Sequence, residues 1–251
     1  AEGMLAEGYA GKGRLPEPDE ILALADLKLR QQTGRLAGKK VVVSAGGTVE
    51  PIDPVRFITN RSSGKMGYAL AQAAAEQGAD VTLVSSSELP APVGVTMVPV
   101  QSARELLAAM TDHFDDTDVT IMAAAVSDYR VATPADQKMK KNADHAGLTI
   151  DLVENPDILA TLGQQKTTQY LVGFAAETQD LLTYAQNKLE KKNADMLVAN
   201  DVSKAQVGFG HDTNEVTLLQ RNAAPEKLPL QSKLALARDI MNRIASQVEG
   251  K

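Results

Sequence analysis

The chain has 251 residues, no cysteine, 43% hydrophobic residues and a formal net charge of −6. This composition indicates one large globular domain, or one domain with an appendage, and excludes disulfides, cysteine nucleophiles and thiolate metal sites. The apolar runs are no longer than strands and the first residues lack a signal-peptide pattern, so we expect a cytoplasmic protein. The acidic balance argues against a general nucleic-acid-binding protein, and the histidines lack the spacing of metal ligands.

Residues 1–36 differ from the rest of the chain. They are Gly-rich and then Pro-rich, and a helical pattern runs from Asp19 to about Gln32, where Gly34 ends it. We interpret this segment as a linker or as the tail of a preceding domain. The main domain is then expected at residues 37–251.

The first strand of that domain is predicted at Lys40–Ser44, and a helix with Gly78 as its stop signal at Met66–Gln77. Between them, a loop with Gly46-Gly47 reaches Ser62-Ser63-Gly64 at the start of the helix. A strand, a Gly-rich turn and a helix N-terminus favour a phosphate, because free N–H groups and the helix dipole both attract an anion. The sequence lacks the Gly-Lys-Ser/Thr of a P-loop. The same loop carries Asp53, Arg56 and Asn60, groups suited to a second substrate.

Strands and helices then alternate, which predicts a Rossmann-like three-layer α/β sandwich, a mostly parallel sheet with helices on both faces. Ser102 and Glu105 are expected to form a capping box. Thr178 or Asp180 is expected to open one helix. The predicted strands are Asp80–Val84, Val95–Pro99, the buried central strand Val119–Ala125, Tyr170–Phe174, Asp195–Ala199 and an edge strand at Glu215–Gln220. The predicted helices are Ala103–Met110, Asp157–Leu162, Leu181–Lys192 and Ser232–Ser246.

Ligands of open α/β sheets bind beyond the carboxyl ends of the strands, which singles out Asp128 after the central strand. Residues Arg130–Gly147 are polar and interrupt the α/β rhythm, so we expect a mobile flap there. Its lysines, Lys138, Lys140 and Lys141, would close over a polyphosphate, although a solvated surface is the alternative reading.

Other strand ends carry weaker signals. Asn155 is expected to cap a helix with Pro156 at the first helical position, which explains both residues without a ligand. Phe174 fits a base-stacking position and a core position equally well. Lys188 and Lys192 end a helix, where the dipole alone favours cations, and Asn200 follows the next strand at the same edge.

The chain resembles the phosphopantothenate–cysteine ligase family. This ligase is usually found as the C-terminal half of a bifunctional bacterial protein. The resemblance covers residues from about Gly38 to the C-terminus. It rests on the loop S-A-G-G-T-V-E-P-I-D-P-V-R-F-I-T-N-R-S-S-G-K-M-G at Ser44–Gly67 and on six shorter motifs. These are A-A-A-V-S-D-Y at Ala123–Tyr129, K-M-K-K at Lys138–Lys141, N-P-D-I at Asn155–Ile158, V-G-F-A-A-E-T at Val172–Thr178, K-K-N-A-D at Lys191–Asp195 and A-N-D-V at Ala199–Val202.

The resemblance implies a two-step ligation in which 4′-phosphopantothenate is activated by CTP as an acyl-cytidylate and L-cysteine then displaces CMP. Mg²⁺ would act through the nucleotide phosphates, with no assigned protein ligand. It implies catalytic roles for Asn60 and Lys138, and phosphopantothenate contacts from Asn60, Ala125, Asp128 and, across a homodimer interface, Arg56. It implies nucleotide contacts from Ser62, Ser63, Gly64, Met66, Met122, Ala123, Ala124, Asp128, Lys138, Asn155, Pro156, Asp157, Ile158, Phe174, Lys188 and Lys192.

The stretch Gly3–Pro18 resembles the end of the flavin-dependent decarboxylase domain that precedes the ligase in this family. Glu7 stands where that family has its catalytic cysteine, so we expect neither flavin binding nor decarboxylation from this chain. Two alternatives stay open. A catalytically silent nucleotide-binding or scaffold protein would share the fold, and an NAD(P)-dependent reductase would need a G-x-G-x-x-G turn that is absent after the first strand.

Overall fold

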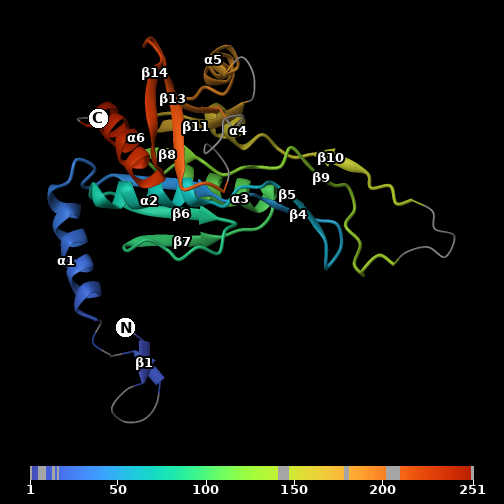
Figure 1. Ribbon diagram of the computed structural model, residues 1–251, viewed down its shortest axis with the longest axis horizontal. Coiled ribbons are helices and arrows are strands. Elements are labelled where there is room, and N and C mark those ends of the chain that lie inside the picture. Colours follow the sequence, from blue (N-terminus) through green and yellow to red (C-terminus); the bar gives the residue numbers. More distant parts are fainter. Residues whose placement is uncertain are drawn as a thin grey trace.

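The computed structural model describes residues 2–4, 10–12, 15, 17–140, 147–177, 181–201 and 210–249. Its centre is an eight-stranded sheet in the order β14-β13-β12-β11-β8-β3-β6-β7 (Figure 1). Its first six strands along the chain pair in parallel, and the last two pair antiparallel. The strands are β3 (Lys40–Ala45), β6 (Asp80–Ser85), β7 (Val95–Pro99), β8 (Val119–Met122), β11 (Tyr170–Glu177), β12 (Met196–Asp201), β13 (Thr213–Gln220) and β14 (Glu226–Ser232). The predicted Rossmann-like sheet is confirmed.

Helices cover both faces of this sheet, because alternate residues of each central strand point to opposite sides. Val41 and Val43 pack into one hydrophobic cluster with α2 (Lys65–Glu76) and α6 (Lys233–Val248). Val42 packs into a second cluster with α3 (Ala103–Phe114), α4 (Ile158–Gln165) and α5 (Leu181–Lys191). The result is the three-layer sandwich expected for strands buried on both faces.

The direction of chain growth reverses at β3. From β3 the chain adds β6 and β7 on one side, and it then returns to place β8 on the other side of β3. The loops that follow β3 and β8 therefore diverge from adjacent strands, which is the topological switch point where open α/β sheets bind ligands. The two loops are tied together, since Ala125 N donates to Gly46 O at 2.8 Å and Thr48 N donates to Ala125 O at 3.1 Å.

The N-terminal segment contains a short hairpin, β1 (Glu2–Met4) with β2 (Ala10–Lys12), and the helix α1 (Pro18–Thr33), which extends away from the sheet in Figure 1. The helix ends at Gly34 as predicted, whereas the hairpin was not predicted. Leu27 and Leu36 are buried, and Leu36 N donates to Gln77 O at 2.9 Å. The last turns of α1 therefore rest on the main domain.

Two short hairpins form an arm, defined here as β4 (Val49–Pro51), β5 (Phe57–Thr59), β9 (Tyr129–Val131) and β10 (Leu152–Glu154). The arm extends to one side of the sheet in Figure 1. It occupies the loop after β3 and the base of the expected flap, so neither segment is irregular throughout. Residues 141–146 of that flap lie outside the described residues, and so do Thr178 and Asp180.

Several predicted boundaries are corrected. The central strand ends at Met122 and not at Ala125, β11 continues to Glu177, and β12 runs from Met196 to Asp201. Strand β13 is not an edge strand, because the unpredicted β14 covers it. In the expected capping box, Ser102 Oγ accepts from Glu105 N, but Glu105 accepts from Gln101 N and not from the N-cap N–H. Within the described residues, no helix combines the length and apolar character needed to cross a bilayer.

Candidate functional site

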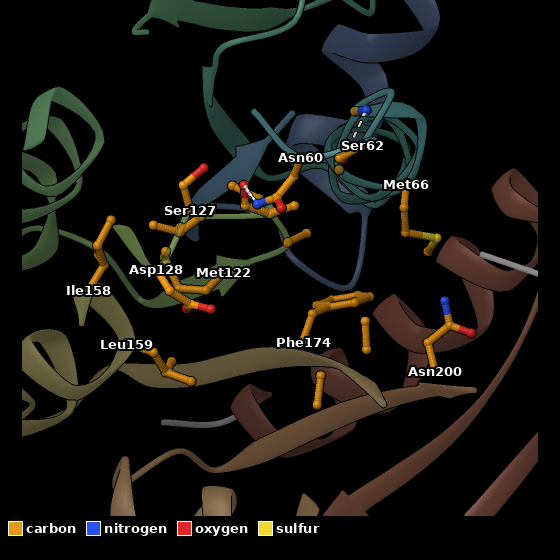
Figure 2. Close-up of a pocket in the computed structure, with 18 of the residues that line it drawn as sticks. Asn60, Ser62, Met66, Met122, Ser127, Asp128, Ile158, Leu159, Phe174 and Asn200 are labelled. Atoms are coloured by element: carbon orange, nitrogen blue, oxygen red, sulfur yellow. Dashed lines mark hydrogen bonds between the residues drawn. The ribbon is translucent and has the colours of Figure 1, made fainter. Parts of the chain in front are cut away.

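A cavity of about 650 Å³ lies beyond the carboxyl ends of β3, β8, β11 and β12. Its walls come from the segments that follow these strands and from the N-termini of α2, α4 and α6. In Figure 2, Asn60, Ser62 and Met66 lie along one side of this space, with Phe174 and Asn200 across from them. The candidate functional residues therefore lie at the carboxyl edge of the sheet, where the topology of open α/β sheets predicts a ligand site.

The N-terminus of α2 forms one wall of the cavity. Gly64 is its N-cap residue, with φ of 79°, and no side chain caps the helix. Beside it, Ser62 Oγ accepts a weak hydrogen bond from Gly64 N at 3.4 Å, and Ser87 Oγ donates to Ser63 O at 3.2 Å. Because the first N–H groups of a helix have no partners within it, an uncapped terminus that faces a cavity suits an anion.

The first turn of α2 lies very close to β3. A Cβ added at Gly67 would lie 2.5 Å from Ala45 Cβ and 2.8 Å from Ser44 O, so only glycine fits there. Ser44 in turn accepts a hydrogen bond at its Oγ from Ala124 N at 3.1 Å. The glycine thus fixes the helix end against the strand that also orients the Ala123–Ala125 segment.

Three lysines line the cavity and offer positive charge to an anion, Lys65, Lys188 and Lys233, beside the carboxylates Asp128, Glu154 and Asp157. Lys65 Nζ lies 2.6 Å from Asp212 Oδ1, and Lys188 Nζ donates to Phe174 O at 3.2 Å. Lys233 is the first residue of α6 and is only 8% exposed. Burial lowers the pKa of Lys233 and repulsion from Lys65 lowers it further, while Asp212 opposes the change. A bound anion would relieve this unfavourable burial of positive charge.

Amide groups position the loop after β8. Asn60 Nδ2 donates to Ala125 O, and Asn155 Nδ2 donates to Ser127 O, each at 2.9 Å. Asn155 N also donates to Asp128 O at 2.7 Å, which leaves the exposed Asp128 carboxylate at the cavity. These contacts hold carbonyl and carboxylate groups around the cavity in a fixed arrangement.

The Asn155–Ile158 motif differs from its predicted local structure. Asp157, not Asn155, is the N-cap of α4, and its Oδ1 accepts from Ala160 N at 2.9 Å. Burial raises the pKa of Asp157, but hydrogen bonds from Lys192 Nζ and Ala160 N outweigh it, so the pKa is lowered overall. Asn155 is free to orient the β8 loop because the carboxylate performs the capping.

Most of the predicted site residues meet in this one cavity. Those that line it are Asn60, Ser62, Ser63, Gly64, Met66, Met122, Ala123, Ala124, Ala125, Asp128, Asn155, Pro156, Asp157, Ile158, Phe174 and Lys188. Phe174 is half-buried, so it packs on the core and also presents its side chain to the cavity. Arg56, Lys138 and Lys192 are not among the lining residues. Lys192 pairs with Asp157 at the rim, while Arg56 and the exposed Lys138 belong to the arm and the flap.

Sequence reasoning gave no role to Lys65, Lys233, Asn200 or Asn214, all of which line the cavity. In the sequence, only Asn200 could have been linked to the cavity, because it lies at the carboxyl end of a predicted strand. Within the part of the chain that the structure describes, the buried Oδ1 of Asn200 has no hydrogen-bond partner. A buried amide oxygen without a partner is costly, which is common where a ligand or water completes the site.

The fold and the cavity together define a Rossmann-like α/β protein with a polar, lysine-containing cavity at the carboxyl edge of its sheet. Residues 36–248 match the family described as the DNA/pantothenate metabolism flavoprotein C-terminal domain, and the chain belongs to this family. The resemblance found in the sequence is thereby confirmed.

Similar proteins extend this result. The coenzyme A biosynthesis bifunctional protein CoaBC of Bacillus subtilis strain 168 is 48% identical over 98% of this chain. The match spans 61% of the length of that relative, so this chain corresponds to only part of it. A crystal structure of the C-terminal domain of CoaBC is 42% identical, has a TM-score of 0.73, and is matched over 87% of this chain and all of that one. A Cab2 variant in complex with phosphopantothenate-cysteine shares the fold, at 18% identity and a TM-score of 0.69 over 94% of this chain and 95% of its own.

Proposed function

We propose that this chain joins 4′-phosphopantothenate to L-cysteine with CTP, giving 4′-phosphopantothenoylcysteine, CMP and pyrophosphate. One observation carries the proposal: a single cavity combines an uncapped helix N-terminus and three lysines with the polar groups Asn60 and Asp128. The first set suits a triphosphate and the second a polar organic substrate. The similarity to a coenzyme A biosynthesis protein selects the substrates, and CTP follows from the resemblance to the bacterial members.

The reaction has two balanced steps. A carboxylate oxygen of phosphopantothenate attacks the α-phosphorus of CTP, the bond to the β-phosphate oxygen breaks, and pyrophosphate leaves. The amine nitrogen of cysteine then attacks the carbonyl carbon of the acyl-cytidylate, and the bond to the CMP oxygen breaks as the nitrogen loses a proton. Activation is needed because a carboxylate has no leaving group that a neutral amine can displace.

The residues that line the cavity divide between the two substrates in this scheme. The nucleotide phosphates would lie at Ser62, Ser63, Gly64 and Met66, where the α2 N-terminus and Lys188 offset their charge. The nucleoside would lie along Met122–Ala124, Asn155–Ile158 and Phe174. Asn60, Ala125 and Asp128 would contact the pantothenate part and the acyl-cytidylate. Lys138 would reach over from the flap to the α-phosphate, and Lys192 would hold Asp157 at the rim.

A Mg²⁺ ion fits this site only as a partner of the nucleotide. Among the described residues there is no group of three or more histidine or acidic side chains that could hold a metal alone. Asp128 offers one exposed carboxylate at the cavity, whereas Asp157 is already engaged by Lys192 and Ala160 N. Mg²⁺ commonly uses one or two carboxylates and substrate phosphates. When bound, it would offset the negative charge of the triphosphate.

The proposal includes a homodimer with sites at the interface, and the arm supplies its surface. Val55 is 58% exposed and Phe57 is 55% exposed, and Leu152 in β10, on the neighbouring β9–β10 pair, is 46% exposed. Exposed apolar side chains gathered on a projecting element are typical of an interaction site. A second copy of the chain is the proposed occupant, because Arg56 lies between Val55 and Phe57 and would reach the phosphate of the substrate held by the partner.

The test omits cysteine. The protein is mixed with Mg²⁺, CTP and 4′-phosphopantothenate, and mass spectrometry is used to look for the phosphopantothenoyl-cytidylate. We expect this intermediate to form and cysteine to convert it to the amide and CMP. If neither CTP nor ATP gives the intermediate and cysteine gives no product, the proposal fails and a catalytically silent nucleotide-binding protein takes its place.

A further inference from the structure

The strongest unassigned feature is an ion pair at the tip of the β4–β5 hairpin, between the buried Asp53 and the exposed Arg56. The Asp53 side chain has no exposed surface, and it pairs with Arg56, whose Nε and Nη2 both donate to Asp53 Oδ2. The backbone N–H groups of Val55 and Arg56 donate to the other carboxylate oxygen, each at 2.9 Å. The Arg56 guanidinium, helped by the N–H groups of Val55, Met139 and Arg56, keeps the pKa of Asp53 well below its usual range despite burial. The Asp53 carboxylate is therefore ionised at neutral pH.

This pair also holds the flap. Met139 N donates to Asp53 Oδ2 at 3.1 Å, and Arg56 Nη2 donates to Met139 O at 2.9 Å. Both backbone groups of one flap residue are thus bound by the two members of one ion pair. A further hydrogen bond, from Ala135 N to Ile52 O at 2.9 Å, fixes the chain four residues earlier. Lys138 lies between these two attachments.

The hairpin that carries the pair is itself fixed to the main domain. The buried Glu50 accepts a hydrogen bond from Ala103 N at the start of α3, at 2.9 Å, and Val49 N donates to Gln101 O at 2.9 Å. Thr59 Oγ1 donates to Thr48 O, also at 2.9 Å. Hydrogen bonds therefore link the start of α3 to the hairpin, and the hairpin to Met139, next to Lys138.

We propose that Asp53 is a positioning residue, which acts through Arg56 and the backbone of Met139 to hold the flap so that Lys138 reaches the nucleotide. The inference rests on the proposed function, because it takes Lys138 to act in the first step. The proposal gives the Arg56 guanidinium two roles: it contacts a substrate phosphate, and it also holds Asp53 and Met139. Among the described residues nothing accepts from Arg56 Nη1, so that edge is left for a substrate phosphate while Nε and Nη2 serve Asp53 and Met139.

Asp53→Asn tests the proposal, because the amide keeps the shape but loses the charge that holds Arg56. Pyrophosphate release is measured in a single turnover without cysteine, at saturating CTP and phosphopantothenate. We expect this rate to fall roughly 100-fold, the usual effect of misplacing a catalytic group by about 1 Å. Amide formation from acyl-cytidylate supplied at a saturating concentration should lose less of its rate, because Lys138 has no role in that step. Equal loss in both steps would overturn the proposal, because it would indicate general damage to the site.

A second comparison separates positioning from stability. Asp195→Asn is the matched control: Asp195 also accepts from a lysine, Lys166, and from a backbone N–H, that of Leu171, but at the amino end of β11. It should lower the thermal midpoint and leave the first step unchanged.

A readout independent of activity comes from trypsin, which cleaves after Lys138 and Lys140. Fragments ending at these residues, followed by mass spectrometry, should appear faster from Asp53→Asn than from Asp195→Asn. If Asp53→Asn does not fold, Arg56→Lys replaces it, since lysine keeps the charge beside Asp53 but loses the planar fork that also reaches Met139 O. Unchanged cleavage in the folded variant overturns the proposal. Failure of the wild-type chain to form acyl-cytidylate at all would instead count against the proposed function.

Discussion

Substitution of Gly67 by alanine separates two physical effects that predict opposite signs. Helix propensity alone predicts stabilisation by about 1 kcal/mol, because alanine is a better helix former than glycine. The structure predicts the reverse, since the new methyl group would lie 2.5 Å from Ala45 Cβ and 2.8 Å from Ser44 O. Both contacts belong to β3, whose side chains at these positions are buried and whose backbone is paired on both sides.

The magnitude follows from how little β3 can move. Overpacking a rigid core costs about 1–3 kcal/mol, and a backbone oxygen in a central strand places this site in the upper half of that range. After the gain in propensity, we expect Gly67→Ala to lower the free energy of unfolding by about 1–2 kcal/mol, a value that combines these two estimates. The first turn of α2 should also move away from β3, which would weaken binding of nucleotide triphosphate at that helix end.

Urea unfolding of the wild type and of Gly67→Ala, followed by circular dichroism, measures the stability change, and calorimetry with CTP measures the affinity. Ala45→Gly is the matched partner, because it removes the methyl group nearest to the new one. Gly67→Ala should cost less in the Ala45→Gly background than in the wild type, although the contact with Ser44 O persists. A gain in stability from Gly67→Ala alone would refute the close packing of α2 on β3.

Three further outcomes are expected. Asn60→Asp should leave pyrophosphate release largely intact and slow amide formation, about 10-fold or more, because a carboxylate cannot donate to Ala125 O as the Asn60 amide does; equal loss in both steps would contradict the role of Asn60. Lys138→Gln should abolish pyrophosphate release, and a normal burst in that variant would exclude Lys138 from activation. CTP affinity, measured by calorimetry across alkaline pH, should fall at a pH below the ordinary lysine range, because burial and Lys65 lower the pKa of Lys233 in the free protein. In the same range the stability of the free protein should rise with pH, since the unfolded chain retains more protons there than the folded one. If a Lys233→Met variant keeps the full pH dependence, that dependence comes from a group other than Lys233.

The sequence predicted the elements whose periodicity is strong and missed those whose pairing depends on distant residues. The parallel strands of the sheet were found because buried strands read as apolar runs. Strand β14 was missed because it contains Pro229 and polar side chains, a composition that an edge strand tolerates. The end of β8 was misplaced for a different reason: Ala123–Ala125 are as apolar as the strand, but their backbone turns to form the cavity wall.

In the candidate site, too, residues grouped by local sequence were predicted and residues brought in from distant segments were missed. Residues within the continuous loop Ser44–Gly67 could be grouped because their neighbours in sequence form the turn and the helix end. Lys233 and Asn214 could not, since only the antiparallel return of β13 and β14 brings the start of α6 to the cavity. The cap of α4 was assigned to the wrong residue because asparagine and aspartate are equally good caps. The two residues differ in that the Asn155 amide can donate a hydrogen bond to Ser127 O, which the Asp157 carboxylate cannot.

The placement of Lys233 couples completion of the cavity to the folding of the chain. One part of the cavity wall comes from Lys233, at the head of the helix α6 that covers the alanine-rich face of α2. Until α6 has been synthesised and has docked, a nascent chain presents an incomplete cavity and an uncovered apolar helix. Binding competence and burial of this apolar surface are therefore acquired in one docking event.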